Sequence, residues 1–340
     1  MVKVVFTGMR DLPQLPADEE KYRKAGAQFI KKVPCSTEEE VIAGAGDADA
    51  VITVRSPYTR RVIENLSRCR LISVCSAGYE YVDVDAATEH GICVTNMPAY
   101  SIDEVSDHAM ALLLACARKI TRLNDAVKKG SWDSLEKPKI FQLLPPMSRL
   151  RDQFLGIIGL GRIGRSLIPK AQGFGLRIIT YDPYISPAEA EKMRVKLAGL
   201  DELLSESDFV TIHALLDSQT HHLLSENQFR KMKSTAYVIN VARGGIIDEA
   251  ALYAALSRGY IAGAALDVLD TEPPAPDNPL FKMDNVIITP HTAFYSQQAV
   301  AQALRQPEEE VFRVLQGEWP HNLVNPEVKE KFSARWQKLS

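Results

Sequence analysis

Short runs of apolar, often β-branched residues alternate with amphipathic segments along most of this chain. In the first hundred residues the apolar runs are 2–7, 50–54, 71–74 and 92–95, with helical spacing between them at 37–45 and 83–90. The same alternation continues later, with apolar runs at 155–158, 177–181, 209–213, 237–241, 264–268 and 286–289. Alternating strands and helices predict parallel sheets flanked by helices, so we expect an α/β fold with two such domains.

Two long helical patterns connect these halves. Residues 101–123 carry apolar side chains at helical spacing, and Ser101 with Glu104 predicts a capping box at the start of this helix. A second helical segment, 297–316, is followed by a short polar tail, and a single helix cannot form its own core. We therefore predict a discontinuous domain of residues 1–100 plus 295–340 and a second domain of residues 101–294. The stretch 130–153 predicts an extended loop, either a polar surface loop or an oligomer contact.

A glycine-rich turn follows the run at 155–158. Gly159, Gly161 and Gly164 form the spacing G-x-G-x-x-G, which allows a tight turn, close approach of a pyrophosphate and close packing of the next helix. The phosphates would lie at that helix's N-terminus, where free N–H groups favour negative charge. Asp182 ends the next apolar run, where a carboxylate would bind the ribose hydroxyls and repel a 2′-phosphate. These residues predict NAD rather than NADP.

Polar residues fall at the ends of the other predicted strands of this domain. Ligands of open α/β sheets bind beyond the carboxyl ends of the strands. Arg243 suits a clamp on a carboxylate and an adjacent carbonyl, although a surface salt bridge is the alternative. His291 suits proton exchange near neutral pH, with Glu272 fixing its tautomer, whereas each alone would more often be structural or solvated.

Composition narrows the class of protein further. The 340 residues are 46% hydrophobic and 24% charged, and the net charge of −3 gives no electrostatic footprint for nucleic acid or a membrane surface. The five cysteines form no C-x-x-C pair, which is typical of reduced thiols, so we expect a cytoplasmic protein. No apolar run approaches the length of a membrane span, and no metal-site, P-loop or nucleophile-elbow motif is present.

Four segments together resemble the D-isomer-specific 2-hydroxyacid dehydrogenase family, near its C-terminal-binding-protein and phosphoglycerate-dehydrogenase-like branch: 156–164, 240–248, 264–273 and 289–291. The resemblance implies two Rossmann- or flavodoxin-like domains, a homodimer, NAD as cofactor and a small 2-oxo or 2-hydroxy acid as substrate. It implies that Arg243 binds the substrate while His291 and Glu272 act as acid/base and partner. The other residues to which it gives roles are Ala77, Gly78 and Phe294 at the substrate, Arg162 and Ile163 at the pyrophosphate, Asp182 at the ribose, and Ala242, Asp267, His213 and Thr220 around the nicotinamide.

Two functional hypotheses remain open at this point. The first is an NAD-dependent dehydrogenase of a small D-2-hydroxy acid, and the second is an NAD(H)-responsive binding protein with little turnover. An enzyme specific for phosphoglycerate is a further possibility, for which Arg55 and Arg60 are the candidate phosphate ligands, although a solvated loop explains them equally well. The family commonly has a proline two residues after the strand-end histidine, whereas here Ala214 and Leu215 follow His213.

Overall fold

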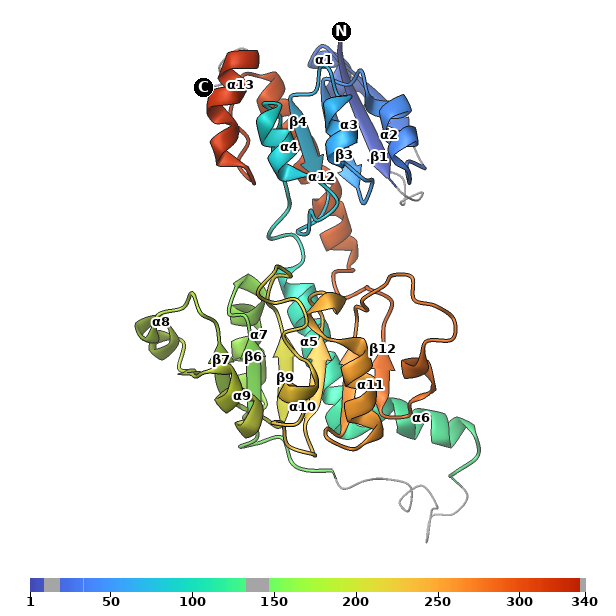
Figure 1. Cartoon of the computed structure of the whole chain (residues 1–340), viewed down its shortest axis with the longest axis vertical. Coiled ribbons are helices and arrows are strands. Elements are labelled where there is room, and N and C mark those ends of the chain that lie inside the picture. The colour runs from blue at the N-terminus through green and yellow to red at the C-terminus, as the bar shows by residue number, and fades with distance from the viewer. Residues whose placement is uncertain (9–18, 33, 133–146, 337–340) are drawn as a thin grey trace. The chain divides into compact units, whose positions relative to one another are not determined.

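The computed structural model describes residues 1–8, 19–32, 34–132 and 147–336. The chain forms two compact units: one combines Met1–Tyr100 with Ser296–Ser340, and the other is Ser101–Tyr295. Figure 1 shows a separate sheet flanked by helices in each unit. The predicted α/β class with parallel sheets is therefore confirmed. Most of the loop predicted at 130–153 lies outside the described residues.

The unit Ser101–Tyr295 is built on a parallel sheet of seven strands in the order β12-β11-β10-β9-β6-β7-β8. The strands are β6 (Phe154–Ile158), β7 (Arg177–Tyr181), β8 (Lys196–Leu197), β9 (Phe209–Ile212), β10 (Tyr237–Asn240), β11 (Gly263–Leu266) and β12 (Val286–Ile288). Strand order reverses next to β6, the strand that enters the glycine turn. In a doubly wound sheet such a reversal opens the crevice in which ligands bind.

Two apolar layers enclose this sheet. One layer joins the sheet to α5 (Ile102–Arg118), α7 (Arg162–Gly173) and α8 (Pro187–Lys192). The other joins it to α9 (Leu200–Glu206), α10 (Glu226–Phe229) and α11 (Glu249–Ser257). Figure 1 shows α10 and α11 on the face of the sheet opposite α5. Burial on both faces explains why these strands are nearly continuous apolar runs.

The connecting helix differs from the prediction at both of its ends. Ser101 precedes α5 without a side-chain cap, so the predicted capping box does not form. The helix also stops early, because Lys119 takes a left-handed conformation (φ 54°) and separates α5 from α6 (Ile120–Lys128). None of the residues of α6 is buried. Helical spacing continued through Lys119, so periodicity alone gave no signal of the break.

The other unit has a five-stranded parallel sheet in the order β2-β1-β3-β4-β5. Its strands are β1 (Val2–Gly8), β2 (Ala27–Lys32), β3 (Ala50–Val54), β4 (Leu71–Val74) and β5 (Cys93–Thr95). The sequence reading missed β2. This edge strand ends in Lys31 and Lys32, both exposed, and therefore lacks the apolar run of a buried strand.

Helices from both ends of the chain cover this second sheet. One apolar layer contains α2 (Glu38–Ala45), α3 (Arg60–Glu64) and α4 (Val84–Glu89), and the other contains α1 (Glu19–Lys24), α12 (Gln297–Leu315) and α13 (Lys329–Arg335). The prediction of one C-terminal helix and a polar tail was wrong, because α13 forms and fully buries Phe332. The sequence of the tail is mostly polar, but the side chain of Phe332 packs in the apolar core.

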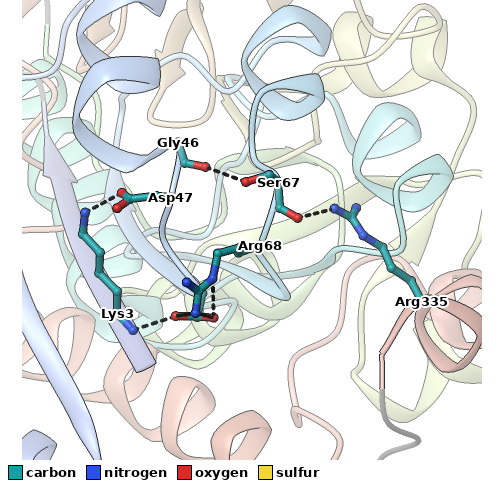
Figure 2. A network of polar contacts seen from close by, with 7 residues as sticks. Lys3, Gly46, Asp47, Ser67, Arg68 and Arg335 are labelled. Atoms are coloured by element: carbon teal, nitrogen blue, oxygen red, sulfur yellow. Dashed lines mark hydrogen bonds and ion pairs between the residues drawn. The ribbon is translucent and has the colours of Figure 1, made fainter. Parts of the chain in front are cut away.

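A polar network ties the C-terminal helix to the amino-terminal end of the sheet (Figure 2). Buried Asp49 accepts hydrogen bonds from the Lys3 backbone N–H (2.7 Å) and from Arg68 Nη2 (3.0 and 3.2 Å). The neighbouring Ser67 carbonyl accepts a bond from Arg335 Nη2 (2.8 Å). Within this unit, the network lies at the opposite end of the sheet from the loop of Ala77 and Gly78, which follows β4, and this position fits a structural role.

Candidate active site

Three neighbouring strands supply the predicted catalytic residues of the unit Ser101–Tyr295. Arg243 follows β10, Glu272 follows β11 and His291 follows β12, and these strands pair in that order. Because carboxyl ends of parallel strands meet at one edge, the three residues come from one edge of one sheet. The edge also carries Gly159 after β6, Asp182 after β7 and His213 after β9.

His291 and Glu272 form a direct pair. The Nδ1 atom of His291 lies 2.6 Å from Glu272 Oε2, and both side chains are about one-quarter exposed. The second carboxylate oxygen, Oε1, accepts a bond from the Leu269 N–H (3.2 Å), which fixes the carboxylate plane. Since a carboxylate accepts and does not donate, the imidazole carries a proton on Nδ1.

The backbone at His291 is held in a strained turn. Its φ of 52° lies in the left-handed region, which costs a non-glycine residue about 1–2 kcal/mol. Asp267 compensates, because its carbonyl accepts the His291 N–H (2.8 Å) and its carboxylate accepts the N–H groups of Thr292 and Ala293 (2.9 Å each). Asp267, for which the resemblance implied a place beside the nicotinamide, thus also shapes the turn of His291.

The turn that carries Arg243 is held by Asn240, a residue that the sequence analysis did not predict as part of the site. Buried Asn240 donates to the Arg243 carbonyl (2.8 Å) and accepts from the Ala242 N–H (3.0 Å), closing the turn after β10. The next residue, Gly244, lies so close to the chain after β11 that an added Cβ would be 2.0 Å from the Leu269 carbonyl carbon. The available signal was an asparagine at a strand end, four residues before the glycine pair that starts at Gly244.

The glycine turn has the shape that a dinucleotide diphosphate requires. Gly159 has φ 89°, and an added Cβ would lie 2.6 Å from the Ala214 nitrogen, so only glycine fits. Gly161 precedes α7 without a side-chain cap, and its Cβ position faces open space with no atom within 4 Å. Gly164 lets the first turn of α7 approach the Gly159 carbonyl, 2.4 Å from an added Cβ. An uncapped helix start beside open space fits a bound diphosphate.

Three predicted cofactor residues lie on the same segment as the glycine turn. Arg162 and Ile163 are the first residues of α7; Arg162 is exposed, whereas Ile163 packs against the apolar layer of α5 and α7. Asp182 braces the turn directly, since its carboxylate accepts the Leu160 N–H (2.7 Å) and the Tyr184 N–H (2.9 Å). Each carboxylate oxygen retains a lone pair for a ribose hydroxyl.

His213 and Thr220 delimit the loop after β9. Burial lowers the pKa of His213 to about 4, so the imidazole is neutral at physiological pH. Its Nε2 lies 3.0 Å from Thr211 Oγ1, and among the described residues its buried Nδ1 has no partner. The Thr220 hydroxyl is used within the loop, donating to the Leu215 carbonyl (2.6 Å) and accepting from the Asp217 N–H (2.8 Å).

The predicted substrate loop, with Ala77 and Gly78, belongs to the unit that contains the N-terminus. Three consecutive carbonyls of this loop, at positions 76 to 78, accept hydrogen bonds from Met97 N–H (2.9 Å), Asn96 Nδ2 (2.7 Å) and Ser76 Oγ (2.6 Å) respectively. In a trans peptide the N–H points away from the carbonyl, so the following N–H groups turn the other way. Within the described part of the chain, the Ala77 and Gly78 N–H groups donate to no residue. The loop can therefore offer these N–H groups to an anion.

The remaining candidates are an aromatic residue and two arginines. Phe294 is partly buried against the core of α5 and α7 and meets Tyr295 edge to face, with 6.3 Å between ring centroids. Arg60 pairs with Glu89 (2.5 Å) on the surface, which gives it a structural partner. Arg55 is exposed and has a left-handed backbone (φ 56°).

The described parts of the chain contain no group of three or more histidine, cysteine or acidic residues arranged to hold a metal ion. All five cysteines are buried free thiols. No described helix combines the length and the apolar character needed to cross a bilayer.

Fold and site together define a dinucleotide-binding α/β protein with an arginine and a histidine–glutamate pair at the sheet edge. The model of the D-isomer specific 2-hydroxyacid dehydrogenase NAD binding domain matches residues 110–293, more than half of the chain. The chain belongs to this family. The predicted family is thereby confirmed, and so is the predicted cofactor, NAD.

Named relatives support the same assignment. A D-3-phosphoglycerate dehydrogenase of Methanocaldococcus jannaschii is 43% identical over 85% of this chain, which spans 54% of that protein. A glyoxylate reductase of Korarchaeum cryptofilum is 38% identical, covering 85% of this chain and 86% of the relative. A D-lactate dehydrogenase from Aquifex aeolicus, solved with NAD and lactic acid, superimposes with a TM-score of 0.74 at 30% identity, covering 92% of this chain and 94% of that one. The chain thus spans about half of one relative and most of the other two.

Proposed function

We propose that this protein is an NAD-dependent oxidoreductase that interconverts a small D-2-hydroxy acid and its 2-oxo acid. The observation that carries the proposal is the 2.6 Å contact between His291 Nδ1 and Glu272 Oε2, at the sheet edge where Arg243 follows the neighbouring strand β10. An oriented imidazole and a guanidinium at one sheet edge match the two needs of the reaction, proton exchange at oxygen and binding of a carboxylate. Family membership supports the same reaction.

In this proposal the protein aligns the reactants and moves the proton. The bound cofactor would supply the hydride as NADH in reduction and accept it as NAD⁺ in oxidation. In the reductive direction, His291 donates the Nε2 proton to the substrate oxygen, and Glu272 stabilises the charge of the imidazole through Nδ1. Arg243 binds the substrate carboxylate and polarises the adjacent carbonyl, because a guanidinium presents several donors in one plane. The N–H groups of Ala77 and Gly78 are proposed as further donors to the carboxylate.

The proposed substrate is small and carries no phosphate. A phosphorylated substrate would require cationic side chains beyond Arg243. One of the two candidate phosphate ligands, Arg60, already forms an ion pair with Glu89, and its Nε atom also lies 3.8 Å from Asp83 Oδ2. A relative that is 38% identical is named a glyoxylate reductase, which also supports a small 2-oxo acid. Phosphohydroxypyruvate is therefore expected to be a poor substrate compared with glyoxylate or hydroxypyruvate.

The test is NADH oxidation with a panel of 2-oxo acids: glyoxylate, hydroxypyruvate, pyruvate, phosphohydroxypyruvate and one bulky aromatic acid. Turnover on a small member that disappears in His291→Ala, while NADH still binds, supports the proposal. NADH binding with negligible turnover on every member would refute it and favour the NAD(H)-sensing binding protein. NADPH in place of NADH is the matched cofactor control, since Asp182 is expected to repel a 2′-phosphate.

We further propose that the protein is a cytoplasmic homodimer. Helix α6 exposes Ile120 (53%) and Val127 (38%), two turns apart on one side, and Trp132 just beyond the helix is 64% exposed. An amphipathic helix with no buried residue fits burial against a second copy of the chain. Ile120→Glu is expected to shift the sedimentation coefficient to that of a monomer; an unchanged value would place the dimer contact elsewhere.

The cytoplasmic location is proposed because the five cysteines are buried free thiols, which fit a reducing compartment.

A further inference from the structure

We propose that His108 is a positioning residue for the acid/base group His291, acting through Thr289 and Asp267. His108 lies on α5, far from His291 in sequence, and carries none of the roles assigned above. The proposal rests on the proposed function of His291. The four residues belong to one unit, so the argument uses only contacts inside that unit.

The first step is the central role of Asp267. Its side chain is 1% exposed, and its carbonyl and carboxylate together accept the N–H groups of three consecutive residues, His291, Thr292 and Ala293. The backbone of His291 is left-handed and the N–H groups of the next two residues are hydrogen-bonded, so the backbone dihedral angles of this turn have little freedom to change. The orientation of the imidazole therefore depends on where the Asp267 carboxylate is held.

The second step is what holds the carboxylate. Thr289 Oγ1 lies 2.6 Å from Asp267 Oδ1, and His108 Nε2 lies 3.0 Å from the same hydroxyl. An ionised carboxylate only accepts, so the single hydroxyl proton of Thr289 points to Asp267. The hydroxyl oxygen must then accept from His108, which places a proton on Nε2 of that imidazole. One chain of donors thus runs from His108 through Thr289 to Asp267.

The third step is the rigidity of the anchor. His108 is in the middle of α5, a helix of 17 residues that is packed against the sheet through Leu112 and Leu113. Its side chain is 24% exposed, and its Nε2 is also 3.5 Å from Asp267 Oδ1. Within the described part of the chain, no lysine or arginine side chain forms an ion pair with this buried carboxylate. His108 therefore ties the turn that carries His291 to α5, a helix that packs against the sheet.

The experiment compares two histidine replacements in the full-length protein. His108→Leu removes the donor, whereas the amide of His108→Gln can still donate to Thr289. In reduction of the best 2-oxo acid of the panel, the leucine variant is expected to lose about 10-fold to 100-fold in kcat, because a small misplacement of a reacting group has this effect. Its KM and its NADH dissociation constant are expected to change little. The glutamine variant is expected to recover most of kcat.

Two further variants separate positioning from general loss of stability. Thr289→Val removes the hydroxyl that links His108 to Asp267, whereas Thr289→Ser keeps it. The valine variant is therefore expected to lose kcat as His108→Leu does, and the serine variant to keep most of kcat as His108→Gln does. His90→Leu is the matched control, a histidine of the other unit whose Nδ1 contacts the Ala86 carbonyl (2.9 Å). This control is expected to lower thermal stability without changing kcat per folded molecule. Equal kcat in His108→Leu and His108→Gln would overturn the proposal.

A spectroscopic measurement decides the proposal without turnover. The imidazole resonances of His291, identified by their absence in His291→Gln, are expected to shift in His108→Leu and Thr289→Val and to stay in place in His108→Gln and Thr289→Ser. Unchanged resonances in all four variants would overturn the positioning role. If the wild-type protein turns over no 2-oxo acid, the proposed function fails, and these resonances still report whether His108 orients His291.

Discussion

The pH dependence of stability should report the burial of His213. Burial lowers the pKa of this imidazole to about 4, compared with about 6.5 in an unfolded chain. Between these two values the unfolded chain binds a proton that the folded chain does not. By linkage the free energy of unfolding rises with pH across that window, so this stabilisation is present above about pH 6.5 and is lost as the pH falls towards about 4.

The magnitude follows from the two pKa values. Between about pH 7.5 and about pH 5, protonation of the unfolded chain at this one site lowers the free energy of unfolding by about 2 kcal/mol. The variant His213→Gln removes the titrating group and keeps an amide near Thr211, so its free energy of unfolding should depend less on pH by that amount. The His90→Gln variant controls for loss of a histidine elsewhere.

Urea unfolding at the two pH values measures the effect, and the histidine ring signals in NMR spectra test its cause. The His213 signal, assigned from the glutamine variant, should titrate near pH 4. The reasoning is refuted if that signal titrates near about pH 6.5, or if wild type and His213→Gln lose the same stability between the two conditions.

Four further substitutions have expected outcomes. Glu272→Gln removes the carboxylate from His291 and should lower kcat by about 100-fold with NADH affinity retained; equal kcat in steady-state assays would contradict the pairing. Gly159→Ala should destabilise the protein by about 1–3 kcal/mol in urea because of its positive φ. Gly161→Ala should leave stability intact and weaken NADH binding in a fluorescence titration, and the reverse pattern would disprove the glycine assignments. Asp49→Asn should lower the unfolding free energy by about 1–3 kcal/mol, since the buried side chain at this position then loses its ion pair with Arg68; an unchanged urea midpoint would exclude that role.

Much of the fold was predictable because local patterns and packing agree. Strands buried on both faces must be apolar throughout, so the strands from β6 to β12 stood out, except the two-residue β8. The pattern failed where burial was partial. The edge strand β2 ends in lysines, and α13 buries one phenylalanine within a polar tail.

The candidate site was predictable as a list of residues but not as a geometry. Glycine spacing and strand-end positions selected Gly159, Asp182, Arg243 and His291, because each of these residue types has a distinct physical use at a strand end. Neither pattern indicated that Asn240 closes the turn of Arg243 or that the Asp182 carboxylate braces the glycine turn.

The sequence by itself determined the class of fold, the family and the cofactor, since these depend on periodicity and on short motifs whose spacing is fixed by local backbone geometry. The tertiary structure alone decided which side chains support the catalytic candidates. The contacts among His108, Thr289, Asp267 and His291 join residues up to 181 positions apart. Hydrogen bonds over such separations depend on how helices pack on the sheet, and no local pattern encodes that packing.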